Sequence, residues 1–170
     1  GAAYYHGFSY VMGGATAPKS MDNKLIDTCR KIPDSALDQN VAIDNSAPYK
    51  CTTAVPKALV RFGAATNLDK DAIWISGGQQ TGATAEDGVW QLTESGGTDT
   101  WVELTSAAAF GARKDHCQFY VDRSKKMYVL AGTTYISTSN NNEYKLAPTD
   151  AGTFNDVWYS SNGILWEQAT

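Results

Sequence analysis

The sequence has few of the side chains on which most enzymes depend. Its 170 residues include 2 His and 3 Cys. The arginines are scattered and number only four: Arg30, Arg61, Arg113 and Arg123. No H-E-x-x-H helix motif or G-x-S-x-G nucleophile elbow occurs. These absences predict a protein that is not an enzyme and that uses no metal ion and no cofactor.

Charge and long apolar runs are also scarce. Against 14 Lys and Arg stand 18 Asp and Glu, which gives a formal net charge of -4, and the basic residues form no run. Nucleic acid is therefore not an expected partner. No apolar stretch approaches the roughly 20 residues that a membrane-spanning helix needs, so no membrane span is expected. With 42% hydrophobic residues, the chain should nevertheless fold.

The cysteines lack the C-x-x-C spacing of zinc sites. Cys29 and Cys51 are a possible disulfide pair; their bridge would close 22 positions, which is worth on the order of 3 kcal/mol in the chain-entropy description. Cys117 lies in an apolar run and is expected to be a small buried side chain. The possible bridge, the low charge and the many Ser, Thr and Asn residues favour an extracellular or secreted location.

What the sequence does contain is 15 Gly, 9 Tyr and 5 Trp. Helical periodicity is nearly absent, whereas short runs of β-branched and aromatic residues recur between Gly-, Asn- and Ser-rich breaks. The clearest of these runs are 72–76, 88–92, 100–104 and 126–130. The sequence therefore predicts an all-β fold.

One pattern recurs three times: aromatic, β-branched, variable, small, Gly. It occupies 10–14, 74–78 and 128–132. A tryptophan pair follows the second and third occurrences, and these four residues are Trp90, Trp101, Trp158 and Trp166. Another apolar run precedes each of these two occurrences, at 58–62 and 116–121, and ends in a polar turn. Each unit is therefore expected to contain four strands.

This order of strands resembles the kelch repeat, whose unit of about 50 residues forms one four-stranded blade of a β-propeller. The third unit is most similar to the repeat. The resemblance implies a partial propeller over residues 1–170, with approximate blades 1–52, 53–106 and 107–170. The first blade is divergent: it lacks the Trp pair, and its first strand is expected to be missing.

The resemblance also assigns structural roles to individual residues. The small residues that end the inner strands should turn the backbone close to a neighbouring blade. The tryptophans should bury large areas between blades, and Arg113 and His116 should bind backbone groups there. These repeat residues are Gly13, Gly14, Gly77, Gly78, Gly132, Trp90, Trp101, Trp158, Trp166, Arg113 and His116. Residues 160–166 resemble the Asp-box turn of sialidase-like propellers, with Asn162 in place of the Asp and a positive φ expected at Gly163.

Propellers typically close with four to eight blades, so about three blades are incomplete as a single chain. We expect either a segment of a longer polypeptide, which the sequence favours, or several copies that complete a ring.

The expected function is non-catalytic: a binding or structural module that mediates protein–protein assembly through polar loops. Protein partners, further blades or copies of the chain are the expected partners. The candidate binding residues mix aromatic and amide side chains: Tyr135, Asn140, Asn141, Asn142 and Tyr144. A carbohydrate-binding, lectin-like propeller that binds glycans is the alternative. A fragment of a galactose-oxidase-like copper enzyme or of a sialidase-like enzyme comes third.

Overall fold

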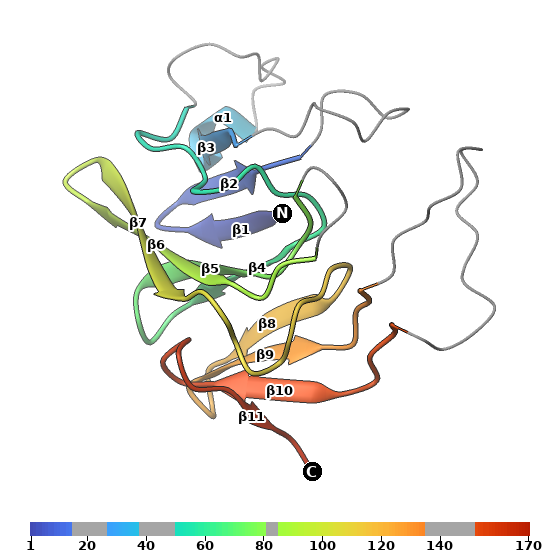
Figure 1. Cartoon of the computed structure of the whole chain (residues 1–170). Coiled ribbons are helices and arrows are strands. Elements are labelled where there is room, and N and C mark those ends of the chain that lie inside the picture. Colours follow the sequence, from blue (N-terminus) through green and yellow to red (C-terminus); the bar gives the residue numbers. More distant parts are fainter. Residues whose placement is uncertain (15–26, 38–49, 81–84, 135–151) are drawn as a thin grey trace, which may run out of the picture.

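The computed structural model describes residues 1–14, 27–37, 50–80, 85–134 and 152–170. In this part of the chain the protein is all-β, with three antiparallel sheets and one short helix, α1 (Asp34–Leu37). None of the three sheets closes on itself. The sheets follow one another in chain order through the molecule (Figure 1). Each lies inside one of the three expected units, whose boundaries remain a prediction.

The first sheet has the order β1-β2-β3, formed by β1 (Ala2–Tyr5), β2 (Phe8–Met12) and β3 (Cys29–Pro33). The sequence predicted that the first strand of this unit is missing, and this is wrong. β1 pairs with β2 across a two-residue turn in which His6 and Gly7 have φ of 52° and 78°. Two successive positive φ values suit the right-handed twist of a hairpin. Two of the four β1 residues are alanine, a weak strand former, so its propensity gave little signal.

Beside β3, where the other sheets have a fourth strand, the residues that the structure describes form one bridge, between Arg30 and Lys50. Next to it, the Cys51 N–H donates to the Cys29 carbonyl at 3.1 Å, and the two cysteines form the expected disulfide with their Cα atoms 5.3 Å apart. The disulfide therefore holds the segment around Cys51 beside β3. At the corresponding place in the second sheet, β6 and β7 are joined by a full ladder of hydrogen bonds.

The second sheet has the order β4-β5-β6-β7, formed by β4 (Gly63–Asn67), β5 (Ala72–Ser76), β6 (Val89–Ser95) and β7 (Thr98–Thr105). The runs at 72–76, 88–92 and 100–104 predicted the last three of these strands.

The predicted opening strand at 58–62 is wrong, because the strand begins only at Gly63. Arg61 has a φ of 58°, which breaks the extended backbone. Leu59 and Phe62 instead bury their side chains in the core, where they are 3% and 7% exposed. Leu59 and Phe62 are therefore apolar because they pack in the core. The strand itself is formed by the small residues of β4.

The third sheet has the order β11-β10-β9-β8, formed by β8 (Cys117–Val121), β9 (Lys126–Leu130), β10 (Val157–Ser160) and β11 (Glu167–Gln168). The turn between β10 and β11 has the expected conformation. Asn162 Oδ1 accepts the N–H groups of Ile164 and Leu165, each at 2.9 Å, and Gly163 has a φ of 75°. The amide therefore binds the backbone in the way that an Asp carboxylate can.

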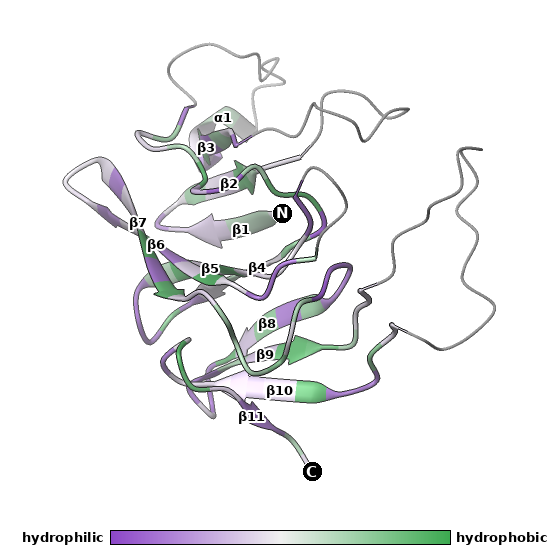
Figure 2. Ribbon diagram, viewed as in Figure 1, coloured by the Kyte–Doolittle hydropathy of each residue, from purple (hydrophilic) through white to green (hydrophobic). Residues whose placement is uncertain are grey.

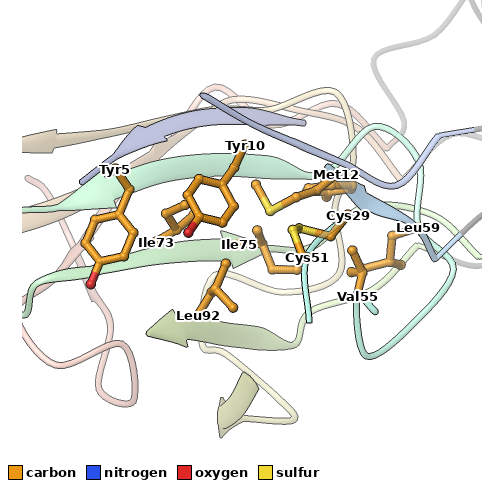
Figure 3. Packing of buried hydrophobic residues seen from close by; sticks show 11 residues of the cluster. Tyr5, Tyr10, Met12, Cys29, Cys51, Val55, Leu59, Ile73, Ile75 and Leu92 are labelled. Atoms are coloured by element: carbon orange, nitrogen blue, oxygen red, sulfur yellow. A yellow bond between two sulfur atoms is a disulfide. The ribbon is translucent and has the colours of Figure 1, made fainter. Parts of the chain in front are cut away.

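Two hydrophobic clusters lie between the sheets. The first cluster lies between the first and second sheets (Figure 3) and contains Tyr5, Tyr10, Met12, Cys29, Cys51, Val55, Leu59, Phe62, Ile73, Ile75 and Leu92. The second cluster joins the second and third sheets and contains Ala72, Trp74, Val89, Ala108, Phe110, Met127, Val129 and Trp166.

Strand β5 belongs to both clusters, and all five of its residues are buried. Successive side chains of a strand point to opposite faces of the sheet. Ile73 and Ile75 accordingly pack into the first cluster, while Ala72 and Trp74 pack into the second. Full burial of one large apolar side chain contributes about 1.5–3 kcal/mol, so the central strand is the best stabilised element of the stack.

Candidate functional site

Three inner strands end in the same backbone conformation. The residue pairs at these ends have φ of 62° and 122° at Gly13 and Gly14, 58° and 99° at Gly77 and Gly78, and 54° and 101° at Ala131 and Gly132. Side chains other than glycine rarely adopt such values. The three occurrences of the sequence pattern therefore share one local structure, including the occurrence in which alanine replaces the first glycine.

In the first two pairs, the second residue lies where the backbone approaches the next unit. The Gly14 N–H donates to the Leu59 carbonyl at 3.0 Å, and the Gly78 N–H donates to the Arg113 carbonyl at 2.8 Å. A Cβ atom on Gly77, the first residue of the same pair, would lie 2.5 Å from the Arg113 carbonyl oxygen, closer than real Cβ atoms come to other atoms. The backbones of two units therefore approach each other closely at this strand end.

Arg113 is fully buried and holds the start of the third unit together. Its two terminal nitrogens bind the two carboxylate oxygens of Asp156 at 2.7 and 3.0 Å, and its Nη1 also donates to the Ala131 carbonyl at 2.9 Å. Its Nη2 donates to the Phe110 carbonyl. Both backbone partners lie in the same expected unit as Arg113, whereas backbone bonds between units were expected.

Asp156 is the partner that the sequence did not single out. Hydrogen bonding to Arg113 holds the pKa of its carboxyl group below the usual range. The Trp158 indole N–H also donates to this carboxylate at 2.7 Å. Asp156 directly precedes β10 and lies two residues before Trp158. This spacing in the sequence was the signal that could have identified Asp156 as a partner.

His116 binds a neighbouring sheet through a side chain, where a backbone partner was expected. The Ser76 hydroxyl donates to Gln118 Oε1, so its Oγ accepts the hydrogen bond that the His116 Nε2–H donates over 3.0 Å. Burial, together with the Arg113 charge, lowers the pKa of His116 to about 4. Gln118 Nε2 completes the contact by donating to the Trp74 carbonyl at 2.9 Å. The imidazole is therefore neutral and fixed between the second and third sheets.

The tryptophans differ in burial. Trp90 and Trp101 are partly buried against the first cluster, while Trp158 is partly buried against the second. Trp166 is 6% exposed within the second cluster, where its ring meets the Phe110 ring edge-on at a centroid distance of 4.9 Å. All four tryptophans thus pack in or against one of the two hydrophobic clusters.

The candidate binding residues Tyr135, Asn140, Asn141, Asn142 and Tyr144 lie outside the described residues. Cys117 was expected to be buried, and this is wrong: it is an exposed free cysteine. It begins β8 on the side of the third sheet that faces away from the second sheet, and no described residue covers it.

A row of aromatic rings crosses that same side of the third sheet. The Phe119 and Tyr128 rings stack with their centroids 5.6 Å apart and their planes at 12°, and the Tyr159 ring follows at 5.8 Å from Tyr128. At the end of the row the Tyr159 hydroxyl donates to Glu167 Oε2 at 2.8 Å, and Lys126 Nζ lies 3.8 Å from the Tyr159 ring centroid. The sequence did not predict this row, because its members lie on three different strands.

A group of polar side chains joins the first two sheets at the hairpin ends. His6 Nε2 lies 2.8 Å from Asp71 Oδ1. The His6 ring stacks on the Tyr5 ring, and the Tyr5 hydroxyl donates to the Asp71 carbonyl at 2.6 Å.

Among the described residues, no group of three or more His, Cys, Asp and Glu side chains is arranged to hold a metal ion. No helix in the same part of the chain has the length and apolar character to cross a membrane.

No protein-family model matches the chain, and no curated protein matches its sequence.

Proposed function

We propose that the chain is a non-catalytic binding or structural module, built of kelch-like β-propeller blades, that mediates protein–protein assembly. The observation that carries the proposal is the repeated way in which one sheet covers the next. Each contact combines a hydrophobic cluster with a hydrogen bond from the second residue of a strand-end pair to the next unit. Such repeat units bury their faces against neighbours, and this way of packing suits assembly.

Kelch-like geometry is supported by the four-stranded antiparallel order of the second and third sheets and by the shared backbone conformation of the strand ends. The disulfide between Cys29 and Cys51 supports an extracellular setting, where such bonds persist. In the proposal, residues 135–151 bind a protein partner through Tyr135, Tyr144 and the asparagines between them.

A second candidate, carbohydrate binding, is favoured by the row of Phe119, Tyr128 and Tyr159. Sugar rings stack on aromatic faces, and a carboxylate such as Glu167 binds hydroxyl groups. The two candidates place the ligand on different parts of the chain, so they can be separated by variants.

The test is chemical cross-linking of the native protein in an extract of its source, with the partner identified from the cross-linked peptides. We expect cross-links to a protein from residues 135–151 and their loss when Asn140, Asn141 and Asn142 are all replaced by Ala. A matched control replaces the exposed Asn155 by Ala and should leave the cross-links intact. Retention on a sugar matrix that depends on Tyr128 would favour the lectin, whereas stoichiometric copper with alcohol oxidation, or glycoside hydrolysis, would contradict a non-catalytic role.

A further inference from the structure

The third sheet has one face that nothing in the described part of the chain covers. We define this outer face by its six largely apolar side chains: Cys117, Phe119, Tyr128, Leu130, Val157 and Tyr159. Cys117 and Phe119 are exposed, and the other four are only half-buried. Leu130 is the cross-strand neighbour of both Cys117 and Val157, and Figure 2 shows the apolar end of β9 beside the apolar start of β10.

The centre of the same face is covered in the two preceding sheets. Three residues before each strand-end pair stands an aromatic residue: Tyr10, Trp74 and Tyr128 in turn. Tyr10 is 0% exposed and Trp74 is 1% exposed, because the following sheet packs on each of them. Tyr128 occupies the third position of this series, and no described sheet packs on it. The outer face is therefore built like two surfaces that are buried contacts between sheets.

The backbone at the rim of the outer face repeats this relation. Gly14 and Gly78 each donate their N–H group to a carbonyl oxygen of the next unit. The corresponding donor is the Gly132 N–H, and among the described residues no acceptor pairs with it. A donor at this position points to another unit of the same kind as the missing neighbour.

The opposite end of the stack carries the complementary surface. Two residues before the strand-end pairs stand Val11, Ile75 and Val129. Ile75 and Val129 are fully buried in the clusters that they share with the preceding sheets. Val11 is 45% exposed and its neighbour across the first sheet, Ala2, is exposed too. One end of the chain thus offers the aromatic side of a contact, and the other end offers the aliphatic side.

We propose that the outer face of the third sheet binds the first sheet of a second copy of this chain, so that Tyr128 of each copy packs against Val11 of the other. The proposal rests on the proposed assembly function. A second copy covers both open faces at once, because the two contacts are head-to-tail and close after two chains. The resulting six sheets fall within the four to eight at which propellers close.

The test is the mass of the native protein by sedimentation over a wide range of concentration. We expect about 37 kDa, twice the 18.3 kDa of one chain. Leu130→Asp places a charge within the outer face and should give the monomer mass. The matched control is Leu68→Asp, which makes the same change in a turn where the side chain is 66% exposed, and it should stay dimeric.

A second variant and a mixture keep the test independent of folding defects. Val11→Asp should also give a monomer, because it alters the other side of the same contact. When the Leu130→Asp and Val11→Asp proteins are mixed, one intact contact can form between them, so dimers should reappear at high concentration. Unfolded variants would not complement each other. A dimer in which the outer faces of two copies bind each other would not be restored by mixing.

The thiol of Cys117 reports on the contact directly. It should react slowly with a thiol reagent in the wild-type dimer and fast in both Asp variants. A wild-type protein that is monomeric at all concentrations, or a dimer that survives both substitutions, overturns the proposal. If that monomer still forms cross-links from residues 135–151, the assembly function stands; if the dimer forms but the chain oxidises alcohols with copper, the assembly function fails and the docking face stands.

Discussion

Ala131 adopts a backbone conformation that glycine adopts at the equivalent positions of the other two sheets. Its φ is 54°, compared with 62° at Gly13 and 58° at Gly77. A Cβ atom in this region costs about 1–2 kcal/mol. The chain tolerates this cost at one of three strand ends, which makes Ala131 a residue whose replacement should improve stability.

We predict that Ala131→Gly raises the free energy of unfolding by about 0.5–1 kcal/mol, because relief of the Cβ strain exceeds the extra chain entropy of glycine. Denaturant unfolding measures the change. The reverse replacement, Gly77→Ala, should destabilise the protein, since its Cβ would lie 2.5 Å from the Arg113 carbonyl oxygen. Equal stability of all three proteins would show that these positions are not strained.

His116 should make stability depend on pH. Its folded-state pKa is about 4, below the ordinary value of about 6.5, because the ring is buried and would have to carry a charge near Arg113. A depressed pKa means that the unfolded chain takes up the proton first as pH falls. The stabilisation is therefore complete above pH 6.5 and is lost between about pH 6.5 and pH 4.

We predict a loss of about 3 kcal/mol over this range from His116 alone, at 1.36 kcal/mol for each pKa unit. The measurement is urea unfolding at several pH values for the wild type and for His116→Gln, which keeps an N–H donor for Ser76. The variant retains the carboxylates that also titrate, so the difference between the two curves isolates the imidazole. Parallel curves would contradict the assignment.

At the scale of strands, local residue patterns predicted the elements whose packing agrees with their propensity. β5 and β9 have the bounds 72–76 and 126–130 that their aromatic and β-branched residues indicated. The prediction failed at 58–62, where apolar residues fill the core from an irregular segment, and at β1, where alanines pair beside a strong strand. In both cases a tertiary contact outweighed propensity.

The candidate site was less predictable than the strands. The repeat positions could be found because a backbone position with a positive φ favours glycine, and glycine is visible in the sequence. The bond between Arg113 and Asp156 and the row from Phe119 to Tyr159 join residues that are distant along the chain. Such pairs depend on strand register, which the sequence alone did not supply.

The disulfide ties Cys51 to β3 in the first sheet. Among the described residues, β3 has one bridge pair on this side, Arg30 with Lys50, whereas β6 and β7 pair along their whole length. We predict that replacing Cys29 and Cys51 by Ala lowers the free energy of unfolding by about 3 kcal/mol, the entropy of a 22-residue loop. Denaturant unfolding of the oxidised wild type and the double variant gives this difference. Replacing Cys117 by Ala is the control, and it should change stability little because that thiol is exposed.

At the scale of the whole molecule, the chain is a directional stack. Each sheet turns an aromatic residue toward the next sheet and an aliphatic residue toward the previous one, as Trp74 and Ile75 do from adjacent positions of β5. The second sheet packs against a neighbouring sheet on both faces, while in the described part of the chain the first and third sheets each pack against one neighbouring sheet. A stack built this way can be extended by another unit, which is the physical basis for the proposed assembly function.

The mass of the native chain in solution tests this account most directly, because it reports whether the open faces meet. Sedimentation equilibrium of the wild-type protein should give about 37 kDa, twice the single-chain mass of 18.3 kDa, with Cys117 protected from thiol reagents. A mass of 18.3 kDa at every concentration, with Cys117 freely reactive, would contradict it.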